Sequence, residues 1–141
     1  MKLAARAVVG IAAAALATTV AAAPAQAAPA PYDIWVVTCD VEDGGTDARV
    51  EARLRGDITS PWFVLDHMSE EFLPGATDDF HFVMPDLGPI RSVDIAIDPQ
   101  GDHWCIEKVI VRGPDGVTVH PYNNWVFRPF RKVAPLRLGA V

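Results

Sequence analysis

Residues 32–56 read YDIWVVTCDVEDGGTDARVEARLRG, and apolar side chains recur at every second position near both ends of this stretch. The alternation in residues 32–39 predicts a strand with one buried face. The alternation in residues 49–55 predicts a second strand, whose other face is charged and which stops at Gly56. The acidic, glycine-containing loop 40–45 joins them. This part of the chain is therefore expected to be β-structure.

Working outward, the same short alternating pattern recurs along the rest of the chain. Six further strands are predicted, at residues 62–65, 79–84, 91–97, 103–112, 116–120 and 124–128. Glycine and proline turns separate them at the spacing typical of an antiparallel sandwich, and prolines spread through these loops are incompatible with a long helix. The expected fold class is all-β, with eight strands and no helix.

The first residues differ in composition from the rest of the chain. Lys2 and Arg6 precede an apolar, alanine-rich stretch at residues 7–23, and small residues at Ala25 and Ala27 form the pattern that signal peptidase recognises. Residues 1–27 are therefore predicted to be a secretory signal peptide cut after Ala27. The mature protein is expected to be secreted and extracellular.

A membrane anchor is the competing interpretation of this segment. It is less favoured because alanine contributes little burial energy, the stretch is short for a bilayer, and Thr18 and Thr19 interrupt it. No later run approaches spanning length, so a transmembrane protein is not expected after cleavage. Residues 28–31 are interpreted as a Pro/Ala lead-in to the domain.

The length of 141 residues allows one domain, and charge is unevenly distributed within it. Residues 28–127 carry six basic against eighteen acidic side chains, a net charge of −12. Residues 129–141 look like a basic, flexible tail that includes Arg131, Lys132 and Arg137. The acidic body argues against a nucleic-acid partner and favours cation binding.

Cys39 and Cys105 are the two cysteines of the chain. In an exported protein they are expected to form a disulfide, because an oxidising compartment favours pairing. A zinc site through His103 and Cys105 is the alternative, but it lacks further ligands at suitable spacing.

Several motifs occur in a recognisable order. They are Tyr32-x-Ile34-x-Val36-x-Thr38-x-Asp40, Gly45-Thr46-Asp47-Ala48-x-Val50, Phe72-x-x-Gly75-x-x-Asp78-x-Phe80, Asp86-Leu87-Gly88-Pro89-Ile90, Trp104, Val109-x-Val111, Tyr122 and Trp125. Together they resemble the PLAT domain of polycystin, lipoxygenase and alpha-toxin, also called the lipoxygenase homology domain, in a secreted, stand-alone, bacterial-type form. The resemblance implies an eight-stranded β-sandwich of two four-stranded sheets over residues 32–128. It also implies that the first and sixth strands share a sheet, where the two cysteines meet on the outer face.

The most specific site prediction is a calcium site, because some PLAT domains bind calcium between two loops. The matching positions here are Gly45, Thr46, Asp47, Asp66, Ser69 and Glu71. Their carboxylates are the hard oxygen donors that Ca²⁺ prefers. His67 departs from the pattern, because imidazole is a poor Ca²⁺ ligand. The alternative is that these acids cap turns and solubilise loop tips. The neighbouring cluster Asp40, Glu42 and Asp43 is interpreted as a solvated acidic turn.

No catalytic motif is found, and the resemblance implies a non-catalytic module. The first functional reading is attachment to a lipid or membrane surface, with Trp62 and Met68 at exposed loop tips. Phe63, Phe72 and Leu73 are candidates for the same role, and the alternative places the two phenylalanines in the core.

Two other readings stay open. An extracellular protein-protein interaction module is the second, with Trp35 on an outward patch that the C-terminal tail alternatively covers. A secreted enzyme with unrecognised chemistry is the third, since function resides in sites and not in folds.

Overall fold

The computed structural model describes residues 21–23, 26–66, 71–98, 103–126 and 136–141. Within these ranges every regular element is a strand, and no helix is long and apolar enough to cross a membrane. The eight strands are β1 (Pro29–Thr38), β2 (Val50–Arg55), β3 (Phe63–Leu65), β4 (Thr77–Pro85), β5 (Ser92–Ile97), β6 (Trp104–Gly113), β7 (Gly116–Val126) and β8 (Leu136–Gly139).

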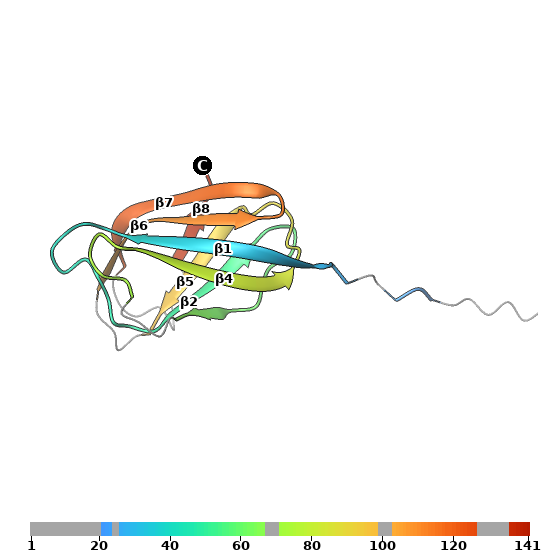
Figure 1. Ribbon diagram of the computed structural model, residues 1–141, viewed down its shortest axis with the longest axis horizontal. Coiled ribbons are helices and arrows are strands. Elements are labelled where there is room, and N and C mark those ends of the chain that lie inside the picture. Colours follow the sequence, from blue (N-terminus) through green and yellow to red (C-terminus); the bar gives the residue numbers. More distant parts are fainter. Residues whose placement is uncertain (1–20, 24–25, 67–70, 99–102, 127–135) are drawn as a thin grey trace, which may run out of the picture.

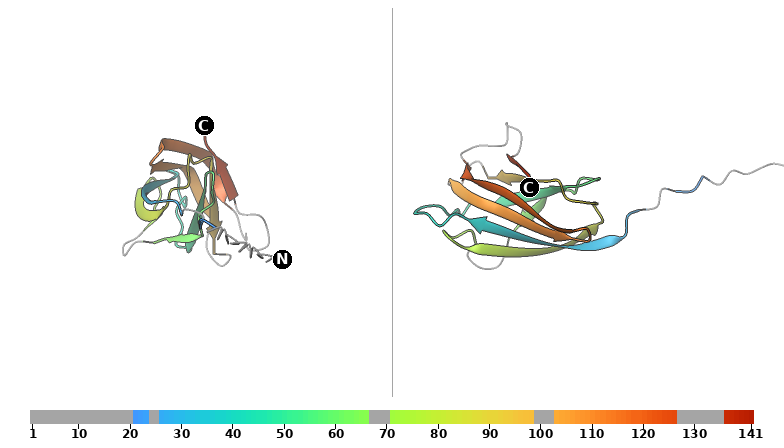
Figure 2. Two further views of the ribbon diagram at one scale, coloured as in Figure 1. Left: turned by 90° about the vertical axis from the view of Figure 1, so that its right-hand side faces the viewer. Right: turned by 90° about the horizontal axis from the view of Figure 1, so that it is seen from above.

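The strands form two four-stranded sheets, ordered β4-β1-β6-β7 and β3-β2-β5-β8, and every pairing is antiparallel. Figures 1 and 2 show the sheets packed face to face as a sandwich. The expected fold class is therefore confirmed, and so is the expectation that the first and sixth strands lie in one sheet.

The core lies between the inner faces of the sheets, where the alternating apolar residues of each strand meet. Tyr32, Ile34 and Val36 of β1 and Val50, Ala52 and Leu54 of β2 are at most 1% exposed. Trp104 and Ile106 of β6 are fully buried, as their parity predicts. Removing this apolar surface from water is the main favourable term in folding.

Strand β1 begins three residues earlier than the alternation predicts. Pro29, Ala30 and Pro31, expected in the lead-in, pair with Pro85, Met84 and Val83 of β4. Ala30 continues the buried parity of Tyr32. Proline is tolerated there because the first residues of a strand need not donate to a central ladder.

Strand β7 joins two strands that the sequence predicts separately. Pro121, Tyr122 and Asn123 lie between the two predicted runs, but β7 continues through them. Pro121 pairs with Lys108 and Asn124 with Ile106, so the register shift between Ile106 and Lys108 of β6 falls at Tyr122 and Asn123. Asn123 has a φ of 51°, a left-handed conformation that asparagine adopts readily. A bulge therefore absorbs the interruption. Residues 127 and 128 lie outside the described part of the chain.

Strand β8 was not predicted, and it corrects the expectation of a flexible tail at residues 136–139. Leu136–Gly139 pairs with Ser92–Ile95 of β5, and Leu138 is only 2% exposed. The burial of Leu138 against the core holds this end of the chain. Residues 129–135 of the predicted tail lie outside the described residues.

Candidate functional site

A hollow opens at one end of the sandwich, between the loop that follows β1 and the loop that precedes β4. The first loop contributes Asp43 and residues 45–49, and the second contributes residues 71–74. Val64, Asp66 and His103 complete the lining. Figure 1 shows the long β1–β2 loop at this end, while the chain enters β1 at the opposite end.

The structure brings five of the six predicted calcium residues to this hollow. Gly45, Thr46 and Asp47 face Asp66 and Glu71 across it. Ser69, Met68 and His67 lie outside the described residues. Asp43 is an exposed turn residue, as its interpretation as part of a solvated acidic turn expects, and it also lines the hollow. The chain turns at Asp43, which has a left-handed φ of 57°, and Asp43 and Asp47 line the same space.

Gly45 is required at its position by close contact between the two loops. The Thr46 amide donates to the Phe72 carbonyl oxygen at 3.1 Å, and a Cβ on Gly45 would lie 2.5 Å from that oxygen. The Thr46 hydroxyl accepts a hydrogen bond from the Ala48 amide at 3.1 Å. Thr46 thus caps the turn that presents Asp47.

Phe72 anchors the second loop to the core. Its ring is 2% exposed, with its centroid 4.8 Å from that of Trp104, and its amide donates to the Asp78 carboxylate at 2.9 Å. The backbone turns sharply here, with a φ of 53°. The core reading of Phe72 is therefore confirmed, and Leu73 is left 48% exposed at the rim.

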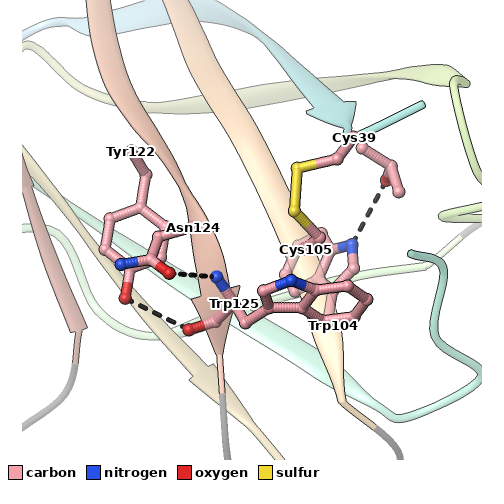
Figure 3. Close-up of a disulfide and its surroundings, with 7 residues drawn as sticks. Cys39, Trp104, Cys105, Tyr122, Asn124 and Trp125 are labelled. Carbon is pink, nitrogen blue, oxygen red and sulfur yellow. Dashed lines mark hydrogen bonds between the residues drawn. A yellow bond between two sulfur atoms is a disulfide. The ribbon is translucent and has the colours of Figure 1, made fainter. Parts of the chain in front are cut away.

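The predicted disulfide is present and joins the residue after β1 to β6. Cys39 and Cys105 are joined with an S–S distance of 2.05 Å. Figure 3 shows the bridge between the end of β1 and β6, with Trp104 donating to the Thr38 hydroxyl at 3.2 Å. The Cys105 amide donates to the Gly44 carbonyl at 2.9 Å. The covalent link therefore holds the base of the loop that carries Asp47.

The side chains around the hollow include the type of oxygen ligand that binds a hard cation. Asp43, Asp47, Asp66 and Glu71 supply carboxylate oxygens, which calcium prefers. Arg49 lies on the same lining, but its guanidinium pairs with the Glu51 carboxylate at 2.9 Å. Among the residues placed in the structure, no three histidine, cysteine, aspartate or glutamate side chains are grouped closely enough to hold a metal ion.

The predicted contact residues do not form one surface. Trp62 precedes β3 and is 38% exposed, with the Arg53 guanidinium 4.5 Å from its ring centroid. Trp35 lies on the outer face of the other sheet, half-buried, with the Arg112 guanidinium 5.2 Å from its ring. Phe63 packs against the core beside Phe82. The exposed apolar residue at the hollow is instead Leu73.

The PLAT/LH2 domain family matches residues 32–131, which is most of the chain. The chain belongs to the PLAT/LH2 family. A curated relative, the lipoxygenase homology domain-containing protein 1 of Mus musculus, is 30% identical over 100 residues. That match covers 67% of this chain and 5% of the relative, so the PLAT chain spans a small part of the relative's length.

Solved structures show the same PLAT fold. Coral 8R-lipoxygenase, described by calcium activation through a C2-like domain, has a TM-score of 0.68 and 24% identity; the match covers 78% of this chain and 17% of that chain. A calcium-dependent 11R-lipoxygenase has a TM-score of 0.59 and 27% identity, covering 79% and 17%.

Proposed function

We propose that this PLAT domain is a secreted, non-catalytic module that attaches to lipid surfaces with the assistance of calcium. The observation that carries the proposal is the position of Leu73, an exposed apolar side chain on the rim of a hollow lined by carboxylates. Similarity to two calcium-regulated lipoxygenases supports it. An extracellular location rests on the signal-peptide prediction.

Asp47, Asp66 and Glu71 would hold the ion, with Asp43 beside them. Calcium, when bound, would supply positive charge that neutralises the acidic rim. Without it, these carboxylates repel an anionic lipid surface at short range. The chain's own contribution is to fix the two loops against each other through the bond from Thr46 to the Phe72 carbonyl. That bond keeps Leu73 beside the carboxylates and directed away from the core.

Cleavage after Ala27 is compatible with this fold. The Ala28 carbonyl accepts a hydrogen bond from the Asp86 amide at 3.0 Å, so the cut would fall just before a residue that is tied to the sandwich.

Vesicle co-sedimentation tests the lipid proposal. We expect the mature protein to pellet with vesicles of phosphatidylcholine and phosphatidylserine in millimolar calcium and to stay in the supernatant with EDTA. Leu73→Ser should weaken the pelleting, because it removes apolar area that enters the interface. Val83→Ser is the matched control, since Val83 is 66% exposed on β4, away from the hollow. Equal pelleting with and without calcium, or none with either, would reject the proposal.

Protein-protein interaction is the second candidate function. Trp35, Ile110 and Val119 stand in register across β1, β6 and β7, and all three are half-buried on the outer face of the first sheet. Val117 is 60% exposed on the same face. An apolar row of this kind favours a protein partner over a vesicle. Absence of vesicle binding, together with saturable capture of an extracellular protein that Trp35→Ala abolishes, would select this alternative.

A further inference from the structure

A cluster of arginines covers the outer face of the second sheet. Asp94 points away from the core on β5, yet its side chain is fully buried beneath three guanidinium groups. Arg53 donates to its Oδ2 through two nitrogens, at 3.0 and 2.6 Å. Arg55 donates to the same oxygen at 2.6 Å, and Arg137 of β8 donates to Oδ1 at 3.1 Å. We call these four residues the arginine face.

The arginine face has more positive charge than its carboxylate requires. Three guanidiniums against one carboxylate leave a net charge of +2 on an otherwise acidic protein. Glu51, the next acid on this face of β2, is engaged by Arg49 at 2.9 Å. Arg53 alone neutralises the charge of this carboxylate, and both of its bonds go to Oδ2. Among the described residues Arg137 alone binds Oδ1, so Arg55 and Arg137 each use their Nε on Asp94 while their two charges are in surplus.

The two surplus arginines also keep unused donors. Each binds Asp94 through its Nε, so the outer nitrogens of both guanidiniums make no hydrogen bond within the part of the chain that the structure describes. The side chains of Arg55 and Arg137 are 30% and 57% exposed. Because Asp94 holds them, their orientation is set before any ligand arrives, which reduces the entropy lost on binding.

The surface between these arginines has room and one further donor. Arg55, Ser92 and Gly139 stand in register across β2, β5 and β8. A Cβ at Gly139 would meet no atom within 4 Å, so no group among the described residues covers that position. Ser92 is 8% exposed, and its hydroxyl makes no hydrogen bond within the part of the chain that the structure describes. Its hydroxyl is thus an unused donor next to the open position at Gly139.

We propose that the arginine face is a binding site for a tetrahedral dianion, that is, a phosphate or sulfate group. Guanidinium forks match the oxygen geometry of such groups, and two surplus charges match a dianion. The bound group would lie over Ser92 and Gly139, between Arg55 and Arg137. This site is independent of the calcium hollow, because Arg55 ends β2 about 20 Å along the strand from Arg49.

Isothermal titration with inorganic phosphate in EDTA tests the site without calcium or lipid. Wild type should bind one phosphate saturably, and sodium chloride should weaken the binding. Arg55→Gln/Arg137→Gln should bind about tenfold more weakly or worse, because charge-assisted bonds are lost. Arg53 keeps two bonds to Asp94, so this variant should fold, which circular dichroism checks.

The matched control is Arg49→Gln/Arg91→Gln, which removes the same charge from arginines paired with Glu51 and Asp57. Its affinity should stay within about twofold of wild type. Arg137→Gln alone replaces the double variant if that one unfolds. No saturable binding by wild type, or an equal loss in the control, overturns the proposal.

A parallel arm identifies the source of the phosphate. Phosphatidic acid vesicles in EDTA are compared with phosphatidylcholine vesicles. If wild type pellets with phosphatidic acid vesicles and Arg55→Gln/Arg137→Gln does not, the site binds the phosphate of a lipid headgroup. Phosphate binding without pelleting supports the site and assigns it to a soluble ligand.

Discussion

Gly45 carries the contact between the two loops of the hollow. Its Cα approaches the Phe72 carbonyl so closely that any side chain would collide with it. The colliding atom is backbone, and the Thr46 amide already binds it, so it cannot move away without loss of a hydrogen bond. At the residue scale, the candidate site therefore depends on glycine for space and on Thr46 for the turn.

Gly45→Ala should lower the free energy of unfolding by about 1–3 kcal/mol, as overpacking at a close contact does. Urea denaturation measures the change. Gly139→Ala is the control, because its Cβ would enter open space, and it should leave stability unchanged or raise it by up to about 1 kcal/mol. Equal destabilisation by both substitutions would contradict the proposed steric role of Gly45.

His120 is a second residue whose environment sets a measurable property. Its ring is fully buried, and Nδ1 lies 3.2 Å from the Leu138 carbonyl while Nε2 lies 2.8 Å from the Thr118 hydroxyl. A carbonyl only accepts, so Nδ1 carries the proton and Nε2 accepts from Thr118. Burial lowers the pKa of His120 below its usual 6.5, against an opposing effect of the Leu138 carbonyl. The neutral ring is the folded form.

Stability should therefore fall as pH drops. The unfolded chain takes up a proton at His120 near pH 6.5 while the folded chain does not, so the contribution is fully present above that pH and is lost below it. The loss has a slope of up to about 1.4 kcal/mol per pH unit. Thermal unfolding between pH 7.5 and 5 should show this slope in wild type and not in His120→Asn. Identical pH profiles would refute the assignment.

At the element scale, strand β8 contributes one side chain to the core and another to the arginine face. Leu138 fills the core while Arg137 faces outward, opposite Asp94. Burial alone raises the pKa of Asp94, but hydrogen bonds from Arg53, Arg55 and Arg137 outweigh it and lower the pKa overall. The carboxylate therefore stays ionised and ties β2, β5 and β8 together.

Asp94→Asn should destabilise the domain by about 2 kcal/mol, because bonds to a charged partner are lost and three guanidiniums are left close together. Asp57→Asn makes the same chemical change in an exposed pair with Arg91, whose side chains are both 62% exposed. That control should change stability by less than about 0.5 kcal/mol. Urea denaturation compares the two, and similar values would show that Asp94 has no special structural role.

The strands were predictable where alternation was long, and not where it was short. Residues 32–39 and 49–55 alternate over several positions, so their strands and inner faces follow from the sequence. In β8 the burial of Leu138 distinguishes the strand from a tail, and the basic residues in this part of the sequence suggested solvent. The arginine face was missed for the same reason, because Arg137 was assigned to that tail.

The candidate site was predictable as a set of residues but not as a geometry. Motif order placed Asp47, Asp66 and Glu71 at two loops, and the structure brings those loops together. Sequence spacing does not show that Asp43 folds back to the same hollow. Sequence spacing also does not show which of Phe72 and Leu73 is buried, because both side chains are apolar. The left-handed backbone at Phe72 determines that Phe72 is buried and Leu73 is exposed.

On the scale of the whole molecule, the sandwich is closed at both lateral edges. Phe63 and Phe82, with ring centroids 4.5 Å apart, join β3 to β4 at one edge. At the other edge, His120 contacts the Leu138 carbonyl, and the Val141 amide donates to the Val119 carbonyl at 3.1 Å. Loops at the end of the body are thus held on a rigid scaffold, as binding loops commonly are.

The central claim is that the hollow at this end is a calcium site, and a calcium titration of thermal unfolding tests it most directly. Calcium should raise the melting temperature of wild type, because an ion that binds only the folded state stabilises it. Asp47→Ala and Asp66→Ala should abolish the rise. The control variant Asp115→Ala removes an exposed carboxylate at the β6–β7 turn, and it should still show the rise in melting temperature. No shift in wild type at millimolar calcium, or an equal shift in all four proteins, would contradict the claim.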